Sequence, residues 1–285
     1  MPTAPPISRR RFLALAWSSL AGGAATFLYT WRVEPHWFRV VRRDMPVAGL
    51  PPALAGRTMV QISDLHVGPI VDPAYLIRAL EFVSGLGQAL TVITGDFMSC
   101  RSSEQVGEVA RVLKHLRTGP LGCLGILGNH DYGTGWMDLG AASDLCEELG
   151  KLGVRVLRNE AVTVGGLQVV GLEDLWGPLF QPERVLAATD WDRPTVVLCH
   201  NPDAADLPIW SGYSGWILSG HTHGGQCKPP FLPPPLLPVK NTRYTSGEFR
   251  LTGGRRLYIN PGLGYLHRVR FNVRPEITVF RLVPV

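Results

Sequence analysis

Residues 123–131 have the sequence Cys-Leu-Gly-Ile-Leu-Gly-Asn-His-Asp, in which a short apolar run is followed directly by polar side chains. A run of this length between turn residues is typical of a buried strand. The same arrangement recurs where residues 59–63 lead to Asp64 and residues 90–94 lead to Asp96. Since α/β sheets bind their ligands at the carboxyl ends of their strands, the sequence predicts an α/β domain with a site along one sheet edge.

The rest of the chain fits an alternation of strands and helices. Apolar residues at helical spacing predict helices over residues 73–86, 103–116 and 141–152. Strands dominate from about residue 154, and we expect them at 167–172, 195–199, 216–218, 257–260 and 276–282. No segment repeats at a fixed period. We therefore expect one domain over residues 57–285, preceded by a linker over residues 34–56 in which Pro46 to Pro52 is rich in turn residues.

Composition excludes several classes of protein. Of the 285 residues 45% are hydrophobic and 18% are charged, which excludes a disordered chain. The net charge is +5, but residues 1–32 contain four arginines and no acid, so the remainder is close to +1. A nearly neutral body argues against a nucleic-acid partner. The cysteines are irregularly spaced without a Cys-x-x-Cys pair, which favours small buried residues over disulfides or a zinc site; they are Cys100, Cys123, Cys146, Cys199 and Cys227.

The N-terminus has the features of an export signal. Ser8-Arg9-Arg10-Arg11-Phe12-Leu13 resembles the twin-arginine signal, and an uncharged run follows from Phe12 to Trp31. The alternative is a chance basic cluster before an ordinary hydrophobic helix. Twenty uncharged residues cover about 30 Å, enough to cross a bilayer. Gly22 to Ala25 weaken the segment as an anchor and leave cleavage open, whereas Trp31 and Trp37 with nearby arginines favour an anchor that is retained over residues 1–33.

Five motifs contain the residues suited to catalysis, and all follow predicted strands. They are Asp64-x-His66, Gly95-Asp96, Gly128-Asn129-His130-Asp131, Cys199-His200-Asn201 and Gly220-His221-Thr222-His223-Gly224-Gly225. Imidazole, carboxylate and amide groups suit divalent Mn, Fe or Zn. An Asp-x-His pair on a strand directs both side chains to one face, and His221 and His223 have the same spacing. The neighbours Cys199 and His200 would face opposite sides of a strand, which argues against a cysteine nucleophile.

With these motifs the chain resembles the calcineurin-like metallophosphoesterase superfamily over residues 57–285. The resemblance implies a four-layer αββα sandwich of two mixed sheets. It implies two divalent metal ions that share Asp96 as a bridging ligand: one ion is held by Asp64, His66, Asp96 and His223, the other by Asp96, Asn129, His200 and His221. Such a centre hydrolyses phosphoric esters with a hydroxide held between the metals. His130 would stabilise charge or protonate the leaving group, and Asp131 would orient His130.

The C-terminal segment narrows the resemblance. Asn260-Pro261-Gly262-Leu263-Gly264, Arg270-Phe271-Asn272 and Arg274-Pro275-Glu276-Ile277 are similar to a branch of twin-arginine-exported or membrane-anchored phosphodiesterases, related to UDP-2,3-diacylglucosamine pyrophosphatases. This resemblance implies a phosphodiesterase on the outer side of the cytoplasmic membrane, with the twin-arginine export machinery as a partner. A lipid pyrophosphatase is the second hypothesis, and a metal-binding module without activity is the third. The presence of His130, which structure does not require, argues against the third.

Three further features bear on the substrate. Residues 229–238 are apolar and rich in proline, and either form a packed crossover or face a membrane beside the metals. Residues 239–285 have nine basic and two acidic residues, which either attract phosphorylated head groups or form a solvated face. Glu173-Asp174 is predicted to be a turn at a strand end rather than a polar contact of the metal site.

Overall fold

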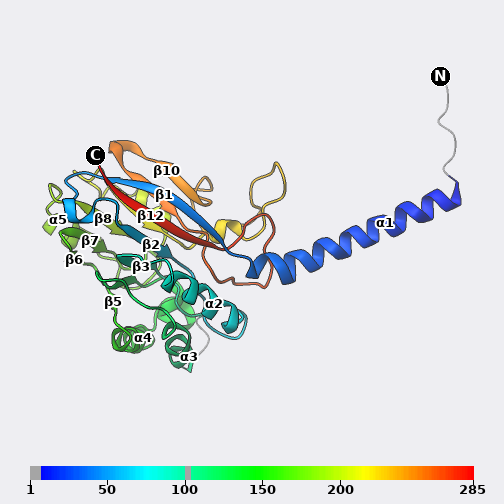
Figure 1. Ribbon diagram of the computed structural model, residues 1–285, viewed down its shortest axis with the longest axis horizontal. Helices are drawn as coiled ribbons and strands as arrows, with labels where there is room; N and C mark the ends of the chain where they lie inside the picture. Colours follow the sequence, from blue (N-terminus) through cyan, green and yellow to red (C-terminus); the bar gives the residue numbers. More distant parts are fainter. Residues whose placement is uncertain (1–7, 100–103) are drawn as a thin grey trace, which may run out of the picture.

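The computed structural model describes residues 8–99 and 104–285, so Cys100 and the predicted helix start at Ser103 lie outside the described residues. Two mixed six-stranded sheets form the body (Figure 1). The first has the order β1 (Arg39–Val47), β12 (Glu276–Pro284), β2 (Thr58–Ile62), β3 (Leu90–Thr94), β4 (Cys123–Ile126) and β5 (Val154–Val156). The second has the order β10 (Gly247–Arg250), β11 (Arg256–Ile259), β9 (Trp216–Ser219), β8 (Thr195–Leu198), β7 (Leu167–Gly171) and β6 (Glu160–Val164).

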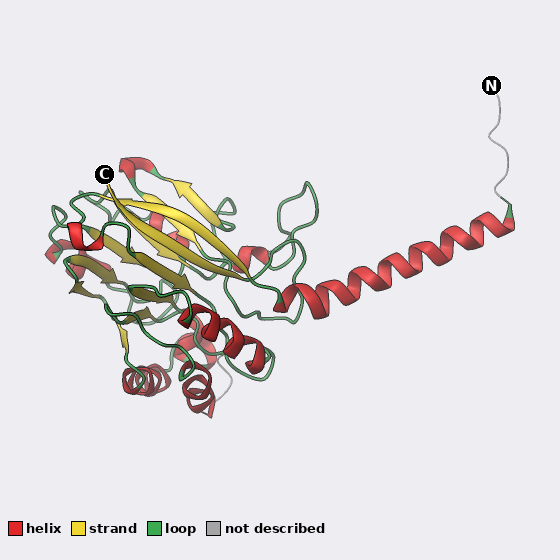
Figure 2. Cartoon of the chain, viewed as in Figure 1, coloured by secondary structure: helices red, strands yellow, loops and turns green. Residues whose placement is uncertain are grey.

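The layers follow from the alternation of side chains along each strand. On β2, Met59 faces the core between the sheets and Val60 faces the outer core; Val196 and Val197 on β8 divide in the same way. The helices α2 (Pro73–Ser84), α3 (Glu104–Leu113) and α4 (Leu139–Lys151) cover the outer face of the first sheet (Figure 2). The short helix α5 (Pro182–Ala188) packs outside the second sheet. The four-layer αββα class is confirmed.

The segment expected to be a linker is part of the first sheet. β1 pairs in parallel with β12 in a register that places Arg39 opposite Glu276. The Arg39 and Glu276 side chains also form an ion pair at 2.7 Å. This strand escapes a search for apolar runs because it lies at the sheet edge, where charged side chains remain in water and Pro46 is tolerated. The linker expected over residues 34–56 is therefore wrong in its central part, and the folded body begins upstream of residue 57.

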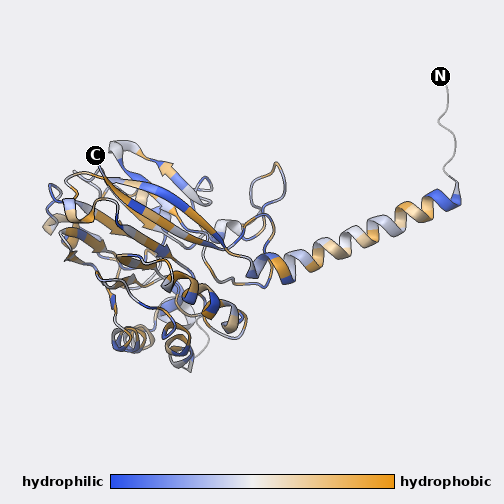
Figure 3. Cartoon of the chain, in the orientation of Figure 1, coloured by the Kyte–Doolittle hydropathy of each residue, from blue (hydrophilic) through white to orange (hydrophobic). Residues whose placement is uncertain are grey.

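An apolar helix precedes the body. α1 (Arg9–Leu28) continues into a π-helical turn (Tyr29–Val33) and a 3-10 turn (Glu34–His36), and no residue of α1 is buried. Residues 9–36 are long and apolar enough to cross a membrane. Figure 3 shows the basic end of this helix at its free terminus, followed by mostly neutral and apolar residues. The helix fits a signal or anchor segment, and its retention or cleavage stays a prediction.

Candidate metal centre

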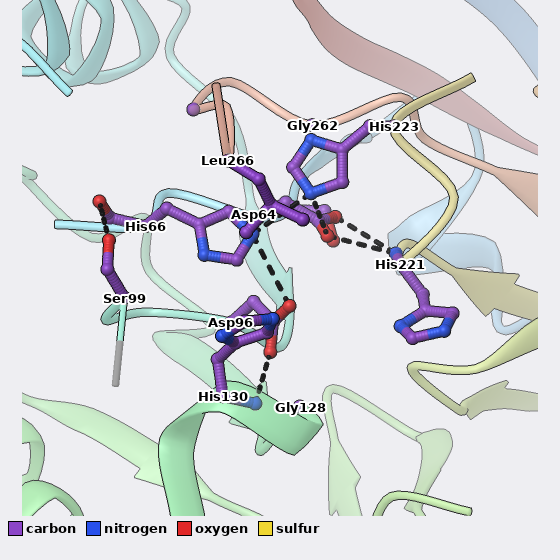
Figure 4. Close-up of polar contacts among 12 residues, drawn as sticks. Asp64, His66, Asp96, Ser99, Gly128, His130, His221, His223, Gly262 and Leu266 are labelled. Atoms are coloured by element: carbon purple, nitrogen blue, oxygen red, sulfur yellow. Dashed lines mark hydrogen bonds and ion pairs between the residues drawn. The ribbon is translucent and has the colours of Figure 1, made fainter. Parts of the chain in front are cut away.

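The five motifs come together at one edge of the sandwich. Each lies in the loop that follows a strand: β2, β3, β4, β8 or β9. Because β2, β3 and β4 run parallel to one another in the first sheet, as β8 and β9 do in the second, their carboxyl ends meet at the same edge. Figure 4 shows the Asp64, His66, Asp96, His221 and His223 side chains converging there.

The first group of side chains has the geometry of one cation site. The Nε2 atoms of His66 and His223 lie 2.9 Å apart, His223 Nε2 lies 3.3 Å from Asp64 Oδ1, and His66 Nε2 lies 3.4 Å from Asp96 Oδ2. Metal–nitrogen bonds of about 2.0–2.1 Å place neighbouring ligand atoms at about such separations. All four residues are buried. These are the residues that the family resemblance assigns to the first metal.

The second group shares one atom with the first. Asp96 Oδ2 lies 3.3 Å from His200 Nε2, and His200 Nε2 lies 3.3 Å from His221 Nδ1. Asn129 Oδ1 is buried and has no hydrogen-bond partner within the described ranges. A buried amide oxygen without a partner is costly unless a cation satisfies it. Asp96 Oδ2 faces both groups, which is the arrangement of a bridging carboxylate, although the ligand roles stay a prediction.

Hydrogen bonds away from the centre fix two of the imidazoles. His200 Nδ1–H donates to the Thr94 carbonyl oxygen at 2.6 Å, and His221 Nε2–H donates to the Pro238 carbonyl oxygen at 2.8 Å. These bonds select the tautomers that leave His200 Nε2 and His221 Nδ1 with lone pairs toward the centre. The His221 backbone N–H also donates to Asp64 Oδ1 at 3.0 Å. The same contacts would orient the ligands of a bound metal.

The electrostatics of the cluster also fit divalent cations. Burial lowers the pKa of His66 and His221 to about 3, so both rings are neutral, as metal ligands must be. Burial raises the pKa of Asp64 to about 7; the neighbouring Asp96 carboxylate adds to this shift and the charge of His200 opposes it. For His200, burial favours the neutral ring, but the carboxylates around it, Asp96 foremost, outweigh burial and hold the pKa well above its usual value, so a cation would take the place of the Nε2 proton. The donor set and its charge therefore fit two divalent cations.

The backbone of the ligand loops is left-handed, and this corrects the expected geometry. Neither Asp64 nor His66 lies on a strand, because β2 ends at Ile62. Their φ angles are 50° and 46°, and those of His221 and His223 are 71° and 50°. Strand alternation therefore does not bring these pairs together. Residues other than glycine avoid this region, so the surrounding fold must hold the strain at the site.

Two glycines permit the close approach of the loops. A Cβ atom on Gly128 would lie 2.2 Å from Asp96 Oδ1, and one on Gly220 would lie 2.0 Å from Ser63 Oγ. Both distances are too short for any side chain. The loops that present Asn129 and His221 can thus pack directly against the loops that present Asp96 and Asp64.

His130 and Asp131 lie beside the ligands. The His130 backbone N–H donates to Asp96 Oδ1 at 3.0 Å, and its ring meets that of His66 edge-on with centroids 4.9 Å apart. The sequence predicts that Asp131 orients the His130 ring. Instead, its carboxylate accepts the Met98 N–H at 3.1 Å and the Gly128 N–H at 2.9 Å. Asp131 therefore positions the loop backbone, and a direct contact with the ring is not part of its role.

Sequence reasoning misses an aromatic wall beside the centre. Trp136 and Trp176 stack with centroids 5.3 Å apart, and each meets an imidazole: Trp136 that of His130 at 5.9 Å and Trp176 that of His221 at 4.5 Å. The signal available in the sequence was their proximity to the motifs: Trp136 lies six residues after His130, and Trp176 lies two residues after Asp174. Both are half-buried, so they border the space above the cluster.

The Glu173-Asp174 segment is a turn, as predicted, and it also supports the centre. The Gly177 N–H donates to the Asp174 carbonyl oxygen at 3.0 Å. Burial raises the pKa of Asp174 to about 6, and the charge of His200 opposes that shift. Glu173 is buried, pairs with Arg158 at 2.6 Å and accepts a hydrogen bond from the Tyr132 hydroxyl in the turn that contains His130. Glu173 thus connects the segment after β7 with the turn that contains His130.

Comparisons with known proteins agree with this geometry. The sequence profile of the calcineurin-like phosphoesterases matches residues 57–225. Phosphodiesterase YaeI of Escherichia coli is 31% identical, with 97% of this chain and 100% of that protein covered. The metallophosphoesterase YkuE of Bacillus subtilis is also 31% identical, over 97% of this chain and 98% of its own. The UDP-2,3-diacylglucosamine pyrophosphatase LpxG of Chlamydia muridarum is 28% identical, over 92% of this chain and 94% of its own.

Proposed function

This chain belongs to the calcineurin-like phosphoesterase family and is a metal-dependent phosphoesterase, and we propose that it hydrolyses phosphodiesters at the outer face of the cytoplasmic membrane. The observation that supports it most strongly is the pair of buried ligand groups that share Asp96. The similarity to a phosphodiesterase over the full length of both chains favours a diester over a monoester.

The residues of the cluster would bind the metals and keep them close together. When bound, two divalent cations supply positive charge that polarises the phosphoryl oxygens and activates water. Asp64, His66 and His223 would hold one cation, and Asn129, His200 and His221 would hold the other, through the atoms described above. Asp96 keeps the two groups together and accepts the backbone N–H of His130 through its second oxygen.

His130 is the proposed proton donor. Its Nδ1 atom is buried without a hydrogen-bond partner among residues 8–99 and 104–285, so no acceptor in the described protein holds a proton there. A positioned imidazole can deliver a proton to the leaving oxygen. Asp131 acts on the backbone and not on the ring. Its carboxylate accepts the backbone N–H groups of Gly128 and Met98 and so holds the turn that presents His130. The Trp136 and Trp176 rings exclude water on one side.

The N-terminal segment supports the proposed location. The three arginines that begin the apolar helix α1 suit twin-arginine export of a folded, metal-loaded protein, and the length of the helix suits a membrane anchor. The partners we propose are therefore the export machinery, the cytoplasmic membrane and a phosphoester substrate, with no nucleic acid.

A lipid pyrophosphatase is the second candidate. The similarity to LpxG and the unburied apolar helix favour it, because a substrate with acyl chains would be reached from the membrane. The third hypothesis, a module that binds metal without hydrolysing anything, has no comparable support. The shared carboxylate and the adjoining His130 are features of a working centre.

The test is metal-dependent hydrolysis by the full chain in detergent. The protein is stripped of metal, reloaded with Mn, Fe or Zn, and assayed with bis-p-nitrophenyl phosphate and p-nitrophenyl phosphate. We expect cleavage that favours the diester and requires metal. Two bound metals with no cleavage of the diester would refute the phosphodiesterase proposal, and cleavage of a UDP-linked diacyl lipid by that sample would establish the second candidate.

A further inference from the structure

The junction between α1 and the body is held by hydrogen bonds. The Thr30 carbonyl oxygen accepts the Arg270 N–H at 3.0 Å, and Glu34 Oε1 accepts the Val273 N–H at 2.7 Å. Thr30 and Glu34 are buried, although they follow an exposed helix directly. We refer to residues 29–38 as the collar. Because the collar is bonded to the loop that contains Arg270, α1 leaves the body at a fixed place rather than from a flexible linker.

The proline-rich loop of residues 229–238 starts beside this collar. The Lys228 N–H donates to the Phe271 carbonyl oxygen at 2.8 Å, and Asn272 Nδ2 donates to the Lys228 carbonyl oxygen at 3.3 Å. Phe271 follows Arg270, which is bonded to Thr30. The loop and the end of α1 are thus joined through the single segment of residues 270–272, and Figure 1 shows the loop projecting from the side of the body that α1 leaves.

This loop holds apolar side chains in water. Phe231 is fully exposed, Leu236 is 79% exposed and Leu232 is 60% exposed. The φ angle of Phe231 is 66°, a conformation that bulky residues avoid. Six of the ten residues are prolines, so the loop is stiff and cannot fold back to bury these side chains. Strain and exposure together at one tip are typical of a surface that meets a partner.

The surroundings of the loop have the composition of a membrane interface. Arg274 lies over the Trp37 ring at 3.8 Å from the centroid, and Arg268 and Arg32 lie over the Trp31 ring at 5.9 and 4.0 Å. Tryptophans gather at the level of lipid head groups, and arginines there attract anionic lipids. Both tryptophans belong to the collar, immediately after the helix that is long enough to span the bilayer.

We propose that residues 229–238 are a second membrane contact, in which Phe231, Leu232 and Leu236 enter the head-group region beside α1. The bilayer is the occupant that the structure favours, because the loop is bonded to the segment in which the apolar helix ends, and a helix in the bilayer brings the loop to its surface. The other end of the loop reaches the metal centre, where the Pro238 carbonyl oxygen accepts the His221 Nε2–H. The loop that would contact the membrane is therefore hydrogen-bonded directly to His221, a predicted metal ligand. The proposal does not depend on which phosphoester is cleaved.

The test places a fluorescent reporter at the tip of the loop. In the full chain, Cys100, Cys146 and Cys227 are replaced by serine, and Phe231→Cys is labelled with the polarity-sensitive dye NBD. Leu236→Cys provides a second position in the loop. The matched control is Val285→Cys, which is 88% exposed and lies on the side of the body away from α1. Each protein is reconstituted into vesicles of phosphatidylethanolamine and phosphatidylglycerol with or without doxyl-labelled lipid.

We expect blue-shifted emission and at least two-fold quenching by doxyl lipid at positions 231 and 236, with neither effect at 285. Quenching of the loop positions by aqueous iodide to the same extent as position 285 would overturn the proposal. The measurement is repeated at a ten-fold lower ratio of protein to lipid. A blue shift that disappears on dilution would show contact with a second copy of the chain and would also overturn it, whereas an unchanged shift supports contact with the bilayer.

Discussion

Replacement of His130 by alanine tests the catalytic assignment most directly. The substitution removes the imidazole but keeps the backbone N–H that donates to Asp96 Oδ1, so the ligand cluster should retain its geometry and both metals. The ring contacts His66 and Trp136, and such contacts contribute about 0.5–1.5 kcal/mol each. We therefore expect a modest loss of stability. Loss of a general acid should lower kcat by about 10²–10⁴, equivalent to about 3–5 kcal/mol of transition-state stabilisation.

The assay uses a series of aryl methyl phosphates whose phenols differ in acidity. If His130 protonates the leaving oxygen, the loss of activity should grow as the phenol becomes a poorer leaving group, because the variant must expel it as an anion. Metal content and melting temperature are measured on the same samples. The matched control is His115→Ala, since His115 pairs with Glu81 on the helical face, outside the cluster.

A variant that binds two metals and keeps the wild-type rate would exclude His130 from catalysis. A loss of activity that is the same for every leaving group would exclude His130 as the proton donor. That result would mean that the imidazole stabilises charge on the phosphoryl oxygens instead of transferring a proton.

Four further predictions follow from the structure. Asp96→Asn should reduce the metal content from two ions to one or none, as measured by plasma emission spectroscopy; two ions retained would exclude the bridging role. Gly128→Ala should lower both metal content and activity, because its Cβ would lie 2.2 Å from Asp96 Oδ1, and normal activity would contradict this. Glu34→Ala should destabilise the domain by about 1–3 kcal/mol in denaturant unfolding, since it leaves the buried Val273 N–H unpaired; an unchanged midpoint would show that the collar is dispensable. Chelation should abolish hydrolysis and lower the melting temperature, and each metal at 100 times its Kd would restore about 2.7 kcal/mol on reloading; a melting temperature unchanged by chelation would argue against a buried binuclear centre.

The central strands and the cluster could be predicted from the sequence because both leave local signals. β3 is an apolar run with Asp96 two residues beyond it, and its predicted bounds of 90–94 are the observed ones. β1 could not be recognised in this way. Its stability comes from pairing with β12, a partner more than 200 residues away, and its exposed arginines hide the pattern.

In the site, the identity of the residues could be predicted from local motifs, whereas their geometry depends on contacts between distant parts of the chain. The residues of the cluster follow from their motifs, but the left-handed backbone of Asp64 and His66 depends on loops that close around them. The actual partners of Asp131 are backbone N–H groups, which no motif specifies. Trp136 and Trp176 come from separate loops that meet only in the folded protein, so their stacking has no counterpart in the linear sequence.

The pairing of β1 with β12 also sets an order of assembly. In the first sheet β1 neighbours only β12, and the contact between Arg39 and Glu276 spans 237 positions of the chain. During synthesis the strand next to α1 must therefore wait, unpaired, until nearly all of the remaining domain has emerged from the ribosome. Contacts between such distant residues form slowly. The apolar helix consequently becomes attached to the first sheet only after the metal loops have been made, so that in a chain interrupted before β12 the helix is not yet joined to that sheet.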